Sequence, residues 1–175
     1  MNRRLRFSPF AVALATAALL PSIPADAATY SNGTATATML VSLTVQAACS
    51  ITANPLNFGS STALTSVVDQ QSTLSVTCAT GTPYNIGLNL GTVSGSTSTS
   101  RLMAGITAGN TSTVAFELYR DSGHANIWGN TQGTDTVGGT GTGSAQTVPV
   151  YGEVSAQTTP QPDTYQTTVT ATLFF

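Results

Sequence analysis

Few side chains in this 175-residue sequence are suited to catalysis or to metal binding. There is one histidine, His124, and there are two cysteines, Cys49 and Cys78. Hydrolases of the common kinds place a nucleophile, a base and an orienting group at motif spacing, and neither G-x-S-x-G nor H-E-x-x-H occurs. The seven acidic residues are scattered along the chain. The sequence therefore predicts that the protein is not an enzyme, with no catalytic residues, no cofactor and no metal.

The first 27 residues have the pattern of a secretion signal. Three arginines among the first six residues form a positive region, and the apolar stretch 11–20 follows it. Ala25 and Ala27 then supply a small-x-small cleavage site. The apolar stretch is too short to span a bilayer. We therefore expect residues 1–27 to be a signal peptide, and the mature chain, 28–175, to be exported without a transmembrane segment.

The expected export of the chain indicates the role of its two cysteines. Export places the chain in an oxidising environment, where a pair of cysteines most simply forms one disulfide. The alternative, a redox or metal site, is disfavoured because no C-x-x-C occurs and only one histidine is available as a further ligand. We expect Cys49 and Cys78 to be bonded to each other.

The composition of the mature chain excludes some partners and indicates a β structure. Without the signal, two arginines remain against six acidic residues, a net charge of −4, and no lysine occurs anywhere. Such a chain has no basic surface for nucleic acid. It is rich in threonine and glycine, which favour strands and turns, and no window has helical periodicity. Its length suits one domain with a sizeable core.

Short alternating segments separated by turn residues predict an all-β sandwich. In one of them Leu74, Val76 and Cys78 share a face, and in another Val114, Phe116 and Leu118 point inward. Two stretches rich in glycine, serine and threonine are expected to be loops, the second of them mobile. The expected strands cover 72–78, 84–90, 112–121 and 165–175, and the expected loops cover 91–100 and 133–145.

In the stretch 34–45, polar and apolar residues alternate over a greater length than one sandwich strand requires. At about 3.3 Å per residue its twelve residues would extend about 40 Å, roughly twice a typical strand. It therefore predicts two consecutive elements, a strand of the domain just before Cys49 and a projecting segment ahead of it. An exposed apolar stripe is an aggregation hazard unless it has an acceptor, and strand addition to another subunit's sheet would supply one.

Five segments together resemble the spore coat protein U domain, the domain of the major subunits of archaic chaperone–usher pili. The resemblance extends from about Thr34 to Phe175. The segments, in chain order, are ACSITANPLNFG, VTCATGTPYNIGLNLG, FELYRDSGHANIWGN, GTGTGSAQTVPVYGEV and TYQTTVTATLFF.

This resemblance implies an incomplete immunoglobulin-like sandwich that lacks its last strand and is completed by a donor strand from a neighbouring subunit. It also implies three partners: a periplasmic chaperone, an outer-membrane usher and identical or homologous pilin subunits. The chain would be secreted through the periplasm into a surface fimbrium that supports adhesion and biofilm formation. Residues 28–45 would be the N-terminal donor segment and 46–175 the pilin domain. The implied donor positions are Ala35, Ala37, Met39, Val41 and Leu43, and the implied groove-bordering strand carries Tyr165, Val169, Ala171, Leu173 and Phe175.

Other interpretations remain open at this point. The same domain can serve a non-fibrous coat or surface protein, and Met39 can fill the core of a self-complemented domain. Tyr119 and Trp128 can form a sugar-stacking platform, although buried core aromatics are commoner. His124 is expected to be solvated in a polar turn, where Arg120 and Asp121 form an adjacent charge pair of little energetic value.

Overall fold

The computed structural model describes residues 33–175, and the expected signal peptide lies outside the described residues. This part of the chain is all-β. The strands are β1 (Cys49–Ala53), β2 (Val68–Cys78), β3 (Pro83–Leu88), β4 (Arg101–Gly105), β5 (Thr113–Tyr119), β6 (Val137–Thr140), β7 (Ala145–Val154), β8 (Tyr165–Gln166) and β9 (Ala171–Phe174).

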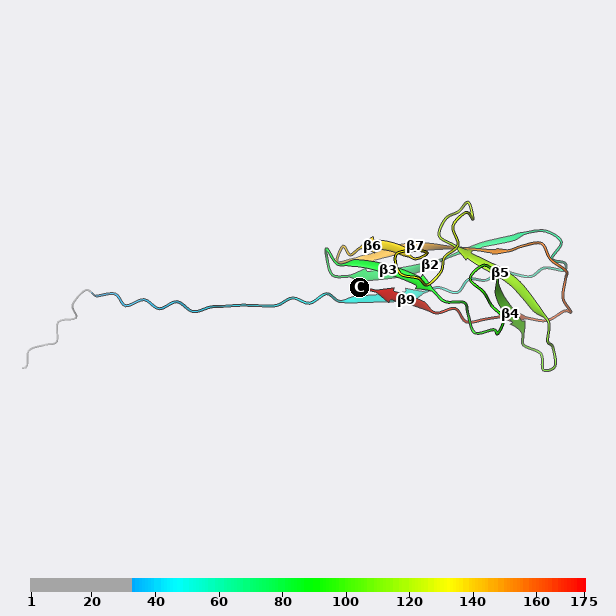
Figure 1. Cartoon of the computed structure of the whole chain (residues 1–175), viewed down its shortest axis with the longest axis horizontal. Coiled ribbons are helices and arrows are strands. Elements are labelled where there is room, and N and C mark those ends of the chain that lie inside the picture. The colour runs from blue at the N-terminus through cyan, green and yellow to red at the C-terminus, as the bar shows by residue number, and fades with distance from the viewer. Residues whose placement is uncertain (1–32) are drawn as a thin grey trace, which may run out of the picture. The chain divides into compact units, whose positions relative to one another are not determined.

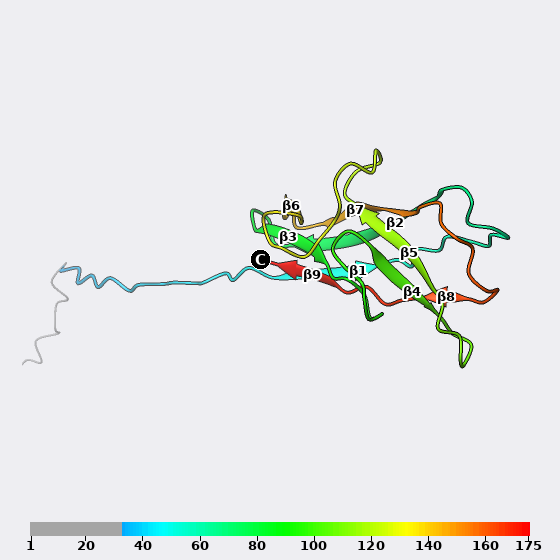
Figure 2. The ribbon, with the colours of Figure 1, turned by 45° about the vertical axis from the view of Figure 1, so that its right-hand side comes forward.

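The strands form two sheets with an immunoglobulin-like arrangement (Figure 1). The larger sheet has the order β1-β2-β7-β5-β4-β8, and the smaller has the order β6-β3-β9. All strand pairs are antiparallel. β1 and β9, which are edge strands of different sheets, lie side by side (Figure 1 and Figure 2).

The expected disulfide is confirmed. Cys49 and Cys78 are bonded and stand directly opposite each other at the start of the β1–β2 pairing. Because the link lies within one sheet, it fixes the register of the edge strand β1 on β2.

The core is built from the alternating residues that the sequence pattern singled out. Leu74, Val76 and Cys78 are buried, and so are Val114, Phe116 and Leu118. Tyr84, Ile86 and Leu88 supply the facing layer from β3. The only tryptophan, Trp128, is fully buried, and its indole Nε1 donates a 2.8 Å hydrogen bond to the Ile86 carbonyl.

Three expectations about strands are wrong. The stretch 133–145 contains β6, which pairs with β3, so it is not simply a loop. The C-terminal stretch is two strands in different sheets, because β8 pairs with β4 and β9 pairs with β3. The first strand of the domain begins at Cys49 and does not precede it.

The chain divides into two units between Ser42 and Leu43. Residues 33–48 have no regular secondary structure, and their side chains are exposed. The second unit, Leu43–Phe175, contains both sheets. No helix within residues 33–175 has the length and apolar character needed to cross a membrane.

Candidate functional site

The second unit contains an apolar groove of about 510 Å³. It is bordered on one side by the end of β1 and the residues after it, and on the other by β8 and the link from β8 to β9. Its lining consists of Ala53, Asn54, Pro55, Leu56, Phe58, Ser72, Leu74, Leu88, Met103, Phe116, Leu118, Val150, Tyr165, Gln166, Thr167, Thr168, Val169 and Ala171.

Both edges of the larger sheet border this groove. β1 and β8 are the two terminal strands of that sheet, and each has one hydrogen-bonded neighbour in it. The larger sheet therefore curls until its edges face the same space. An edge strand presents unpaired backbone N–H and C=O groups along its free side. The groove thus combines an apolar interior with two backbone edges that can pair with a further strand.

Core side chains form the floor of the groove. Leu74, Leu88, Phe116, Leu118 and Val150 line it while being almost fully buried. The wall that follows β1 is aromatic, because the Phe58 ring packs edge-on to Phe116 at a centroid distance of 6.1 Å. An apolar side chain entering the groove would therefore contact the hydrophobic core directly.

The opposite wall, 165–171, is held by hydrogen bonds to Asn89 and Thr92. The Thr170 N–H donates to Asn89 Oδ1 at 2.9 Å, and the Asn89 N–H donates to the Thr170 carbonyl at 3.1 Å. The Thr168 N–H donates to Thr92 Oγ1 at 3.3 Å. These contacts keep an irregular segment in place between two short strands.

Asp163 anchors the beginning of this wall. It accepts hydrogen bonds from the Asn110 amide at 2.6 Å and from the Thr107 N–H and hydroxyl at 3.0 and 2.9 Å. The Asn110 amide, the Thr107 groups and the Thr164 N–H together lower the pKa of Asp163 from 3.8 to about 2, against a smaller opposing effect of desolvation. Asn110 also donates to the Tyr165 hydroxyl at 3.2 Å, which connects this anchor to the groove.

The residues expected on the groove-bordering strand occupy three kinds of position. Tyr165, Val169 and Ala171 line the groove. Leu173 lies in β9 opposite Ile86 and packs against the core. Phe175 lies beyond the end of β9 and is 63% exposed.

The expected donor residues are exposed. Met39, Val41 and Leu43 have exposed fractions of 83%, 80% and 88%, and the small residues Ala35 and Ala37 are exposed as well. Leu40, on the opposite side of the alternating pattern, is also exposed. The donor role of this segment remains a prediction.

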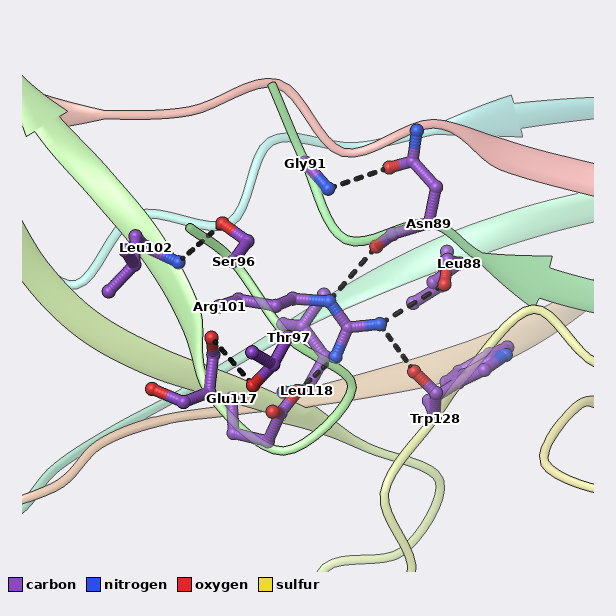
Figure 3. A network of polar contacts seen from close by, with 11 residues as sticks. Leu88, Asn89, Gly91, Ser96, Thr97, Arg101, Leu102, Glu117, Leu118 and Trp128 are labelled. Carbon is purple, nitrogen blue, oxygen red and sulfur yellow. Dashed lines mark hydrogen bonds and ion pairs between the residues drawn. The ribbon is translucent and has the colours of Figure 1, made fainter. Parts of the chain in front are cut away.

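Sequence analysis missed a buried charge network (Figure 3). Arg101 is fully buried and forms an ion pair with Glu117, whose neighbours Phe116 and Leu118 line the groove. Burial raises the pKa of Glu117, and the Leu118 N–H and the Arg101 guanidinium oppose this rise.

The other guanidinium contacts are backbone carbonyls. Nε donates to Asn89 at 3.0 Å, and Nη2 donates to Leu88 at 3.1 Å and to Trp128 at 2.6 Å. Arg101 therefore connects Leu88 in the groove floor, Asn89, which holds the wall, and the buried Trp128. The polarity of Arg101 and Glu117 gave no indication of their burial, because their pairing depends on the fold.

Two alternatives for single residues are wrong. A sugar-stacking Trp128 is excluded because its side chain is fully buried. His124 is not a freely solvated turn residue, because its side chain is only 19% exposed and its Nδ1 lies 3.0 Å from Glu153 Oε2. Arg120 donates to the Thr136 carbonyl, and Asp121 accepts from backbone N–H groups in its own turn.

Comparison with known proteins identifies a family and solved structures of similar fold. The model of the Spore Coat Protein U domain matches residues 35–172. No curated protein sequence matches the chain. A similar solved structure is the CsuC–CsuE complex of a chaperone and a tip adhesion subunit, from archaic chaperone-usher Csu pili of Acinetobacter baumannii. Its TM-score is 0.56 at 23% identity, over 75% of this chain and 41% of the matched chain.

The second structure is HdaB, the minor tip subunit of the E. coli Hda pilus. It has 15% identity and a TM-score of 0.39, over 71% of this chain and 79% of that one. The CsuC–CsuE match supports the fold described above. This chain spans less than half the length of the chain it matches there.

Proposed function

The chain belongs to the Spore Coat Protein U domain family, and we propose that it is a structural pilin subunit of a chaperone–usher surface fibre. In this proposal each subunit donates residues 28–45 to the groove of a neighbour and receives the same segment from another. The protein then has a mechanical role and no catalytic one.

The groove is the observation that carries the proposal. It lies between two edge strands of one sheet, its floor is the hydrophobic core, and the wall after β8 is held by hydrogen bonds to Asn89 and Thr92. A sandwich with this gap lacks one strand. The same chain carries an exposed segment with alternating apolar side chains, Met39, Val41 and Leu43.

The physical fit is that of strand addition. In an extended segment Ala35, Ala37, Met39, Val41 and Leu43 all point to one face, while the backbone can pair with the strand edges. Transferring a large apolar side chain from water to such a floor contributes about 1.5–3 kcal/mol. Met39, Val41 and Leu43 would supply most of this free energy, and the two alanines would suit narrower parts of the groove.

An exposed apolar groove and an exposed apolar segment also require protection before assembly. We therefore propose that a periplasmic chaperone occupies the groove first, by analogy with CsuC and CsuE, which form a chaperone–subunit pre-assembly complex. We propose that an outer-membrane usher then exchanges the chaperone for the donor segment of another subunit. The resulting fimbrium would support adhesion and biofilm formation. A non-fibrous coat protein with the same groove is the second candidate, because the family name itself refers to a spore coat.

Paired substitutions in the donor segment test this proposal. Met39→Asp and Val41→Asp would place an unpaired carboxylate in the apolar groove, at a desolvation cost of several kcal/mol. We expect both changes to abolish the ladder of oligomers that wild-type fibres give in mild detergent without boiling. Thr38→Asp introduces the same charge on the opposite face and is the matched control, which should keep the ladder.

Boiled samples from the periplasm establish that each variant is exported in similar amount. A wild-type protein that yields only monomer would favour the coat-protein alternative. A Val41→Asp chain that unfolds as an isolated monomer would place the segment in its own core and would refute donation between subunits.

A further inference from the structure

Three metal-ligating side chains converge away from the groove. Asp69 belongs to β2, Glu153 belongs to β7, and His124 lies in the loop between β5 and β6. One ligand atom from each lies within 4.8 Å of the others. The imidazole Nδ1 is 3.0 Å from Glu153 Oε2 and 3.7 Å from Asp69 Oδ1.

The fold positions all three residues. Asp69 and Glu153 are directly opposite each other in the β2–β7 pairing, so they share one face of the sheet. His124 adopts a left-handed backbone conformation, with φ of 53°, in a turn closed by the Asp121 carboxylate. Its ring packs on Tyr119 with the centroids 4.8 Å apart. The imidazole is therefore directed to the two carboxylates by its own loop.

Carboxylates lie opposite one another on three neighbouring strands of the larger sheet, and one of them, Glu117, is paired with Arg101. Glu117 stands opposite Glu153 in the β5–β7 pairing, which places three carboxylates in one row with Asp69. Glu117 is 6% exposed, and its Oε2 has no hydrogen-bond partner among residues 33–175.

Neither arginine of the described chain is paired with Asp69 or Glu153. Arg101 is committed to Glu117 and to backbone carbonyls inside the core. The Arg120 guanidinium donates to the Thr136 carbonyl. These are the only two lysine or arginine residues after position 6. A bound cation would balance the charges of Asp69 and Glu153.

We propose that Asp69, His124 and Glu153 bind a divalent transition-metal ion of the zinc class. Tetrahedral zinc with ligands at about 2.0–2.1 Å separates ligand atoms by about 3.3–3.4 Å, and the two measured separations from Nδ1, 3.0 and 3.7 Å, lie on either side of this value. An imidazole with carboxylates suits zinc better than calcium or magnesium, which prefer oxygen ligands alone. Asp69 has a side chain 58% exposed, so solvent can provide a fourth ligand.

The site is separate from the groove. Side chains alternate along a strand, so Asp69 and Glu153 lie on the face opposite to the groove residues Leu74 and Val150. Metal binding would tie the β5–β6 loop to β2 and β7. The proposal therefore does not depend on the proposed fibre function.

The test uses the exported chain purified in its native form, stripped with a chelator and titrated with Zn²⁺ alone against a chromogenic zinc indicator. We expect one zinc per chain. His124→Asn keeps a residue type that tolerates the left-handed backbone, and Glu153→Gln keeps the side-chain shape. Substituting a residue that only hydrogen-bonds to a metal ligand typically weakens metal affinity by about 10- to 100-fold. Substituting a ligand itself should therefore lower the zinc affinity by at least about tenfold.

Asp163→Asn is the control variant, because it removes a carboxylate that is not among the proposed ligands. It should bind zinc with the wild-type affinity. The fluorescence of Trp128, which must match the wild type in every variant compared, establishes that the variants are folded. Zinc binding that is unchanged in His124→Asn would mean adventitious surface binding and would overturn the proposal. Absent zinc binding in the wild type, or binding of Ca²⁺ in its place, would overturn it as well.

Discussion

Removing the Arg101 guanidinium should strongly destabilise the domain. Arg101→Met keeps the apolar stem but leaves the carbonyls of Leu88, Asn89 and Trp128 without their donor. It also leaves Glu117 buried and unpaired. Breaking a buried ion pair by removing one partner costs about 3–5 kcal/mol. That is a large fraction of the roughly 5–15 kcal/mol that stabilises a typical domain.

Trp128 provides the assay. It is the only tryptophan and is fully buried, so its fluorescence reports unfolding in urea without labels. The matched control is Arg120→Met, which removes the only other arginine after position 6 and a single hydrogen bond, to Thr136. The control should cost about 1 kcal/mol. If Arg101→Met also lowers the free energy of unfolding by less than about 1 kcal/mol, the view that the buried pair stabilises the fold is refuted.

The pH dependence of the variant identifies the cause of its instability. Burial raises the folded-state pKa of Glu117, and Arg101→Met removes a charge that opposes this rise. A carboxyl with a raised pKa penalises folding above that pKa, and the penalty disappears below the unfolded value of about 4.3. The variant should therefore regain stability relative to the wild type as the pH falls from 7 toward 4. Adding Glu117→Leu to Arg101→Met should recover part of the loss at pH 7, because no buried carboxylate then remains unpaired.

Three further outcomes are expected. Cys49→Ser opens a loop with a sequence separation of 29 residues and should cost about 3.5 kcal/mol in the chain-entropy model, seen as a lower urea midpoint and poor periplasmic yield. The pKa of Asp163 is lowered to about 2, so the stability that its carboxylate contributes is present above about pH 4 and is lost as the pH falls toward 2. In Asp163→Asn the urea midpoint should therefore fall less between about pH 4 and about pH 2 than in the wild type. Asn89→Ala removes the acceptor of the Thr170 N–H and should raise the hydrogen-exchange rate of that amide well above the wild-type rate; an unchanged rate would contradict the role given to Asn89.

The alternating strands were predictable because each carries its own pattern. Leu74, Val76 and Cys78 define a buried face in the sequence itself, and the structure buries all three. Strand β6 (Val137–Thr140) gave no such signal. Its sequence, VGGT, has almost no apolar side chain to alternate, and it is held through backbone pairing with β3.

The division of the C-terminal stretch into β8 and β9 was not predictable from alternation. The apolar pattern runs from Tyr165 to Phe175 without a break, yet the chain passes from one sheet to the other between Gln166 and Ala171. The crossing depends on Asn89 and Thr92, which are distant in sequence. The cluster of Asp69, His124 and Glu153 depends in the same way on the β2–β7 register and on a turn between β5 and β6.

The buried arginine and the groove are parts of one arrangement. A groove open to a donor strand has to keep its walls apart without a strand between them, and on the β8–β9 side this depends on Asn89, whose side chain holds Thr170. The Asn89 carbonyl in turn accepts from Arg101 Nε, and the guanidinium also fixes Leu88 in the groove floor. One buried cation therefore sets the position of the floor and one wall. A larger apolar side chain could fill the same volume, but it could not bind these carbonyls together, and this explains why an arginine occupies the core of a domain that has so few charges.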